Sequence, residues 1–208
     1  MALGNSGGNT GTLFILKVVD KDKEKRKVSP HFSVSKKGAS GKYELQPDSV
    51  NRVSGNLFKI AIKEQEWNGD KYNTISIYLK DGEEAYLLDL RFNLAARSLF
   101  NSFAALEDYT NLSVTVYENK SGYTALGLWQ GEKMVKWKYK LDELPEPEAV
   151  TFKGKEMRDY SKVDEFFTNV LRELSGKLGG SQKTVTVSEH TSETSTSSAP
   201  ETSEDTPF

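Results

Sequence analysis

Alternation of apolar and polar residues, interrupted by tight-turn signals, is the sequence feature that most limits the folds open to this chain. Over roughly the first 140 residues this two-residue period is clearer than any helical period. Trp67-Asn68-Gly69-Asp70 joins two such segments, and Asp81-Gly82 follows the second of them. Asn-Gly and Asp-Gly accept the positive φ angles of two-residue hairpin turns. The pattern therefore predicts a mostly antiparallel sheet built from neighbouring hairpins.

The predicted strands fall into two groups. A clear alternation marks Thr12–Val19, Leu57–Lys63, Tyr72–Lys80, Ala85–Phe92, Leu112–Glu118, Tyr123–Trp129 and Met134–Leu141. Shorter alternations predict additional strands at Val28–Val34 and Tyr43–Leu45.

Two segments have helical spacing instead. Apolar residues recur at helical spacing in Leu94–Leu106, and Asn93 is suited to cap its first turn. A second helix is predicted to begin at Ser161, where Asp164 completes a variant of the capping box, and to end at Gly176. Its apolar stripe consists of Val163, Phe166, Phe167, Val170, Leu171 and Leu174. Such a stripe predicts that the helix packs back onto the sheet.

An antiparallel sheet interrupted by one helix is typical of the small oligonucleotide-binding (OB) barrel, which closes about five strands and places a helix between the third and the fourth. We therefore predict a mainly β chain with an OB-fold-like antiparallel β-barrel, an inserted helix and a C-terminal helix. The alternative is an incomplete sandwich without barrel closure. Aromatic residues dominate cores, and four are expected there: Phe14, Phe58, Trp137 and Tyr139.

Composition divides the chain into four parts. Residues 1–11 form a polar, glycine-rich leader, residues 12–143 the body, and residues 144–180 a proline-containing linker, Leu144–Glu148, followed by the C-terminal helix. Half of residues 181–208 are Ser or Thr, and Phe208 is their one aromatic residue. Such a segment buries too little apolar surface to offset its ordering entropy. We therefore predict a disordered tail.

Charge changes at the same boundary. Residues 181–208 contain five acidic residues and one lysine, a net charge of −4. The preceding 180 residues contain 27 basic and 25 acidic residues, a net charge of +2. A basic body with an acidic tail is a charge asymmetry found in nucleic-acid-binding proteins.

Several function classes lack the residues that they require. The chain has no cysteine and only two histidines, His31 and His190, too few for a zinc site or a histidine-dependent triad. We therefore expect no enzyme activity, no metal and no cofactor. No apolar run reaches the roughly 20 residues of a membrane span, and the N-terminus lacks the features of a signal peptide. A cytoplasmic location, with no membrane partner, is expected.

The C-terminal tip has a pattern of its own. Glu204 and Asp205 precede a terminal Pro207-Phe208 pair at the end of the polar tail. This ending resembles the tip of bacterial single-stranded DNA-binding proteins and their bacteriophage counterparts. The body has no match to the N-terminal strand segment of the bacterial family, so the resemblance points to a bacteriophage or mobile-element type. It implies binding and protection of single-stranded DNA in replication, recombination or repair, and recruitment of replication and repair proteins through the tip.

The chemistry of the tip agrees with that resemblance. A terminal phenylalanine ring fits an apolar pocket on a partner while its carboxylate meets an arginine or lysine. Pro207 restricts the chain and lowers the ordering entropy lost on binding. The acids Glu204 and Asp205 would meet a basic rim and speed encounter.

Binding of single strands without sequence preference requires a basic groove with aromatic rings on which bases stack. In the strand Tyr72–Lys80, the side chains of Tyr72, Tyr78 and Lys80 share the more polar face. This face is the first predicted DNA contact.

Further DNA contacts are predicted elsewhere. Tyr123 and Trp129 share a face with Ala125 and Gly127, whose small size would admit the close approach of a base or of the nucleic-acid backbone. The remaining candidates are Trp67 and three lysines that alternate along one strand, Lys136, Lys138 and Lys140. The alternative functions are an RNA-binding or strand-annealing module on the same barrel, and a carbohydrate- or protein-binding sandwich on a Ser/Thr-rich stalk.

Overall fold

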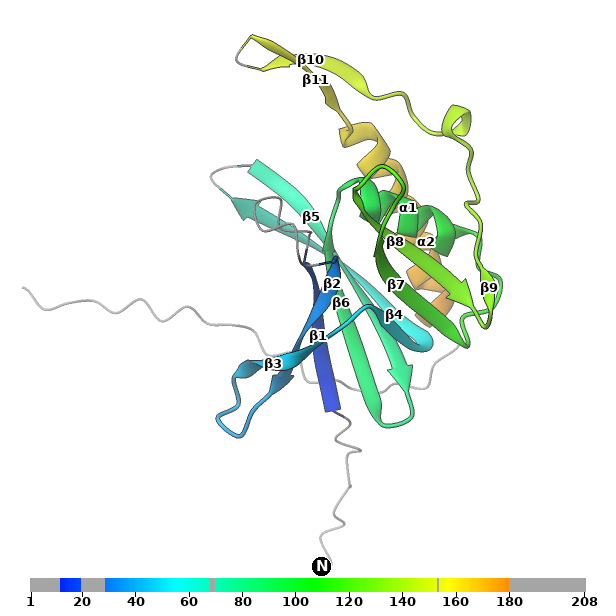
Figure 1. Cartoon of the computed structure of the whole chain (residues 1–208). Helices are drawn as coiled ribbons and strands as arrows, with labels where there is room; N and C mark the ends of the chain where they lie inside the picture. The colour runs from blue at the N-terminus through cyan, green and yellow to red at the C-terminus, as the bar shows by residue number, and fades with distance from the viewer. Residues whose placement is uncertain (1–11, 20–28, 68–69, 153, 180–208) are drawn as a thin grey trace, which may run out of the picture.

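The structure is a computed structural model that describes residues 12–19, 29–67, 70–152 and 154–179 (Figure 1). The chain is mainly β, as the alternation predicts, with two α-helices in these ranges. Neither helix is long and apolar enough to cross a membrane.

Nine strands form one mixed sheet. Its spatial order is β3 (Tyr43–Val50), β2 (His31–Lys37), β1 (Thr12–Val19), β6 (Glu84–Arg91), β5 (Asp70–Asp81), β4 (Arg52–Trp67), β7 (Leu112–Glu118), β8 (Thr124–Gln130) and β9 (Lys133–Met134). All neighbouring pairs are antiparallel except β1 and β6, which are parallel.

The predicted hairpins β4–β5 and β5–β6 are confirmed. Trp67 pairs with Asp70, so two residues connect β4 to β5; these residues, Asn68 and Gly69, lie outside the described ranges. Asp81 pairs with Glu84 at the other end of β5. Gly82 connects them with a φ of 57°, which a glycine adopts without steric strain.

Helix α1 (Leu94–Ala104) follows β6, and its predicted cap is confirmed because the Asn93 side chain accepts a hydrogen bond of 2.8 Å from the Ala96 N–H. Helix α2 (Ser161–Gly179) was predicted to end at Gly176 but continues for three more residues. The predicted capping box is also wrong, since the Asp164 carboxylate accepts from the Arg97 guanidinium at 2.6 and 3.0 Å. This ion pair joins α2 to α1.

A second, two-stranded sheet follows the main sheet in the chain and precedes α2. A short 3₁₀ helix, η1 (Leu141–Glu143), precedes it, and its strands are β10 (Glu148–Phe152) and β11 (Lys155–Asp159). This hairpin projects beyond α2, away from the main sheet (Figure 1). The sequence predicts no strands at β10 and β11, because the proline-containing segment Leu144–Glu148 indicates a linker.

One core fills the inner face of the main sheet. Both helices contribute to it, with Phe100 and Phe103 from α1 and Phe167 from α2 fully buried. Of the four aromatic residues expected in the core, Phe14, Phe58 and Tyr139 are half-buried. Trp137 is 53% exposed, so its core assignment is wrong.

Strand β4 changes partner within its length. Arg52–Gly55 pairs with β7, whereas the part from Asn56 to Trp67 pairs with β5. At the change, Gly55 has a φ of 155°, and a Cβ there would lie 2.8 Å from the backbone oxygen of Lys80. Only glycine lets β5 approach β4 this closely.

Beyond Gly55 the side of β4 opposite β5 has no strand beside it in the described chain. Two other segments form hydrogen bonds with the β4 backbone along part of this edge. The Leu57 N–H donates to the Tyr109 backbone oxygen at 2.8 Å, and the Ser175 hydroxyl of α2 donates to the Ile60 backbone oxygen at 2.9 Å. The C-terminal helix therefore covers a sheet edge as well as part of the core.

We predict that Gly55→Ala lowers the free energy of unfolding by about 2–3 kcal/mol, because alanine requires a strained φ and a backbone displacement. Gly176→Ala is the matched control, since nothing lies within 4 Å of its Cβ position inside α2. That change is expected to raise stability by about 0.5–1 kcal/mol. Urea unfolding of both variants tests the assignment, and equal stability of Gly55→Ala and the unchanged chain would contradict it.

Candidate nucleic-acid interface

Strands β4, β5 and β6 turn a second face away from the core, which we call the outer face. The strand register fixes its members. They are Asn56, Lys59, Ala61, Lys63 and Gln65 of β4; Tyr72, Thr74, Ser76, Tyr78 and Lys80 of β5; and Ala85, Leu87, Asp89 and Arg91 of β6.

The outer face is more basic than the chain as a whole. It contains four cationic side chains, Lys59, Lys63, Lys80 and Arg91, and one acidic side chain, Asp89. Asp89 also accepts a hydrogen bond of 3.3 Å from the Ser76 hydroxyl. An excess of positive charge on one sheet face attracts a polyanion and speeds its association.

Tyr72 lies at one end of this face, held by a cation. The Arg91 guanidinium is 4.7 Å from the centre of its ring and also donates to the Tyr72 oxygen at 3.2 Å. The Tyr72 hydroxyl in turn donates to the Gln65 side chain at 2.9 Å. These contacts fix the ring of a half-buried tyrosine at the surface.

Tyr78 has a related arrangement nearer the other end of β5. The Lys59 ammonium is 5.3 Å from its ring centre, and the Phe58 ring meets it edge-on at 5.8 Å. The pairing of β4 with β5 shifts between Leu57 and Lys59, which inserts Phe58 as an extra residue. Sequence analysis missed this contact because simple alternation places Phe58 on the same face as Ile60 and Ile62.

Thr74 lies between these two tyrosines on β5. Its residue is 4% exposed, and its hydroxyl oxygen is the one buried side-chain oxygen or nitrogen that has no hydrogen-bond partner among the described residues. Its direct neighbours across the sheet on this face are Lys63 and Arg91.

A second aromatic surface lies on β7 and β8. Trp129 is half-buried, and its indole N–H donates to the Thr115 hydroxyl at 3.2 Å. Tyr117 and Tyr123 are more open, at 39% and 62% exposure. At Gly127, a Cβ would lie 3.1 Å from the Thr115 hydroxyl and 3.2 Å from the Tyr117 ring, so the small residue accommodates these two neighbours.

The two aromatic surfaces are separate. In the sheet order, β4 and β7 lie between β5 and β8. Arg52 lies in this gap on β4 and donates to the Ser113 hydroxyl at 2.9 Å. The sequence analysis did not select Arg52, because it lies five residues before the predicted strand Leu57–Lys63.

The predicted strand Met134–Leu141 is wrong, which changes the position of its three lysines. Strand β9 ends at Met134, and the chain then runs along α1. The buried Asn101 side chain of α1 donates to the Tyr139 backbone oxygen and accepts from the Tyr139 N–H, both at 2.9 Å. A helix side chain thus replaces the strand partner that the alternation implied. Lys136, Lys138 and Lys140 are exposed beside α1 and do not join the outer face.

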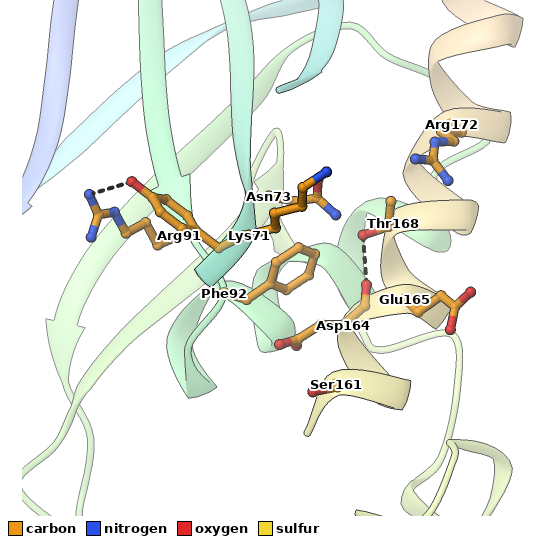
Figure 2. Close-up of a pocket in the computed structure, with 10 residues that line it drawn as sticks. Lys71, Asn73, Arg91, Phe92, Ser161, Asp164, Glu165, Thr168 and Arg172 are labelled. Carbon is orange, nitrogen blue, oxygen red and sulfur yellow. Dashed lines mark hydrogen bonds between the residues drawn. The ribbon is translucent and has the colours of Figure 1, made fainter. Parts of the chain in front are cut away.

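A cleft of about 490 Å³ lies between β5, β6 and α2 (Figure 2). Lys71, Asn73 and Phe92 line it from the sheet, and Thr168 and Arg172 from α2. Tyr72 and Arg91 of the outer face also line it, and Figure 2 shows the Arg91 side chain pointing away from α2. This cleft carries both charge signs, since Asp164 and Glu165 also line it.

The remaining predicted contacts cannot be placed. The side chain of Trp67 lies outside the described part of the structure, although its backbone ends β4. The tip residues Glu204, Asp205, Pro207 and Phe208 are also outside the described ranges.

Comparison with known proteins gives no match. No protein-family model matches the chain, and neither do curated proteins or solved structures.

We predict that Asn101→Leu releases the segment from Val135 to Lys140. The Tyr139 N–H and carbonyl lose their partners, so the free energy of unfolding should fall by about 2–3 kcal/mol. Trypsin should also cleave after Lys136 and Lys138 faster than in the unchanged chain. Asn169→Leu, at an exposed position of α2, is the control; cleavage rates that are the same in both variants would contradict the role of Asn101.

Proposed function

We propose that the chain binds single-stranded DNA along the outer face, without strong sequence preference, and recruits replication, recombination or repair proteins through its acidic C-terminal tip. The observation that carries the DNA-binding proposal is the pair Tyr72 and Tyr78. Each is a half-buried tyrosine on a basic sheet face, and each has a cation against its ring.

The chemistry of this face suits unpaired bases. Tyrosine rings on a sheet offer stacking surfaces to any base, and each stacked base contributes about 1–3 kcal/mol. The lysines and Arg91 supply charge for the phosphates without reading sequence. A duplex hides the faces of its bases within its own stack, so the tyrosines favour single strands.

The order of elements supports an OB-like barrel as the scaffold. Strands β4, β5 and β6 form a meander, α1 follows, and the hairpin β7–β8 returns so that β7 pairs antiparallel with β4. This is the strand–strand–strand–helix–strand–strand order of that barrel class. In addition, only Asn51 separates β3 from β4, and β3 pairs with β2. We propose that this continuous run curls the sheet from β2 and β1 toward β4.

The tail supplies the second half of the proposal. Its net charge of −4 and its terminal Pro207-Phe208 pair suit a partner with a basic, apolar pocket. The same charges would repel phosphate, so we assign partner binding and not DNA binding to the tail.

We predict that Tyr72→Ala and Tyr78→Ala each weaken binding to a mixed-sequence single strand by about thirtyfold, the loss of roughly 2 kcal/mol of stacking. Tyr43→Ala on β3 is the control, because that exposed tyrosine lies four strands away from β5. Fluorescence anisotropy with labelled DNA measures the affinity. Unlabelled duplex and RNA of matched sequence serve as competitors, and equal competition by duplex would defeat the proposal.

The charges give a second measurement that does not depend on the tyrosines. Lys59→Gln and Arg91→Gln should each reduce the salt dependence of binding by about 0.7 in the slope of log K against log salt. An unchanged slope in both variants would show that the outer face does not contact phosphate.

We predict that deletion of Phe208 abolishes partner recruitment while single-stranded DNA binding is retained. The deletion removes the ring and moves the terminal carboxylate back to Pro207, so a pocket loses both contacts. Pulldown from host lysate measures the recruitment, with Ser203→Ala as the control because it keeps the tip intact. Retention of replication or repair proteins by the shortened chain would disprove this role of the tip.

A further inference from the structure

We propose that the Thr74 hydroxyl binds one phosphate group of the bound strand, and that this phosphate lies between Lys63 and Arg91. This inference rests on the proposed function and adds a specific ligand group, a phosphodiester oxygen, at a specific position on the outer face.

The first observation is the missing partner of the Thr74 hydroxyl. The residue is 4% exposed, and its oxygen has no hydrogen-bond partner among the described residues. A buried hydroxyl without a partner destabilises the fold, and native proteins contain few such groups. Nearby polar residues show the ordinary case, since Ser76 donates to Asp89 and Tyr72 donates to Gln65. The hydroxyl of Thr74 is therefore available to a partner that arrives from outside.

The second observation is the charge beside this hydroxyl. Lys63 on β4 and Arg91 on β6 pair directly with Thr74, one on each side. Directly opposite residues of antiparallel strands have Cα atoms about 4.5–5.5 Å apart. A hydroxyl donor between two cations is an arrangement suited to a phosphate group, whose oxygens accept hydrogen bonds and carry the negative charge.

The third observation is the position of Thr74 between the two tyrosines. It is two residues from Tyr72 and four from Tyr78, which is about 7 Å and about 13 Å along a strand. A single strand whose bases stack on both rings must pass its backbone across the intervening residues. Thr74 lies on that path.

Access to the hydroxyl requires side chains to move. Lys63 and Arg91 are both exposed, and their long, flexible side chains can rotate outward from the sheet. Arg91 leaves the Tyr72 ring in this movement and turns its guanidinium to the phosphate. The ring of Tyr72 is then open to a base, so phosphate binding and base stacking occur together.

The variant Thr74→Val tests the proposal, because it keeps the shape of the side chain and removes the hydroxyl. We expect higher thermal stability, since an unsatisfied buried donor is lost, together with about tenfold weaker binding to an oligothymidylate of roughly 12 nucleotides. The salt dependence of binding should stay unchanged, because no charge is removed. A loss of stability would show that the hydroxyl has a partner in the free protein and would overturn the proposal.

Thr168→Val is the matched control. Thr168 is also buried, but its hydroxyl donates to the Asp164 backbone oxygen at 2.7 Å within α2. This change should lower stability, because the satisfied hydrogen bond is lost, with no effect on affinity. The opposite signs of the two stability changes separate a hydroxyl without a partner from a satisfied one.

A change in the DNA identifies the phosphate as the ligand group. Methylphosphonate linkages remove the charge from individual phosphates of the oligothymidylate. A methylphosphonate at one linkage position should lower the affinity of the unchanged protein for the oligothymidylate. The same linkage should lower the affinity of Thr74→Val less, because that variant has already lost the phosphate contact. Equal losses at every linkage in both proteins would overturn the proposal. If the unchanged protein does not bind the oligothymidylate at all, the proposed function itself is contradicted. The substitution Thr74→Val would then change only the stability of the protein.

Discussion

The division of β4 between two partners is the constraint on which the rest of the sheet depends. The backbone groups of a strand this long need partners along both sides, and β7 pairs with only the Arg52–Gly55 part of β4. Gly55 makes the division possible, because the Lys80 backbone lies where a side chain would otherwise stand. The part of β4 that follows is left with one strand neighbour, β5. Its other side needs partners from elsewhere in the chain, and Tyr109 and Ser175 supply two of them.

This constraint connects the C-terminal helix to the proposed DNA-binding face. Helix α2 serves the exposed edge of β4 through Ser175 and the core through residues such as Phe167 and Leu171. The Arg97–Asp164 ion pair, with Arg97 also 4.4 Å from the Tyr160 ring centre, ties its start to α1. Both helices therefore pack against the core and the edge of β4, and α2 also borders Tyr72 and Arg91 of the outer face across the cleft. Lys63, Lys80 and Arg91 of the outer face are exposed.

Sequence periodicity predicted most strands because apolar residues that face the core recur at every second position along them. Strands β1 and β7 have the predicted bounds, and both predicted hairpins of the β4–β6 meander are present. The predicted strand Met134–Leu141 is wrong because a side chain takes the place of a backbone hydrogen-bond partner there. Lys136 to Lys140 alternate like a strand, but Asn101 takes the place of the neighbouring strand, and no local pattern reveals a partner 38 residues away. The parallel pairing of β1 with β6 is likewise a long-range contact that alternation does not encode.

The same reasoning explains what could be predicted of the candidate site. Alternation correctly placed Tyr72, Tyr78 and Lys80 on one face, since their relation lies within a single strand. Arg91, Lys59 and Lys63 come from neighbouring strands, and their positions depend on register, which the bulge at Phe58 shifts by one residue. Thr74 carries no sequence signal at all, because a threonine in a strand is ordinary. Thr74 differs from other strand threonines only in that its buried hydroxyl has no hydrogen-bond partner among the described residues, which only the folded structure shows.

A sheet face that binds single strands must offer aromatic rings to bases and, without a ligand, must not associate with other proteins through the same rings. Open aromatic rings on a flat surface favour association with other proteins when no ligand is bound. On the outer face, Arg91 and Lys59 lie against Tyr72 and Tyr78, so each ring has a contact and the surface keeps its positive charge. A base that displaces a cation from a ring loses that cation–π contact, which lowers the net gain from stacking. In the proposed complex the displaced cation would meet phosphate, and this contact would offset part of the lost cation–π energy.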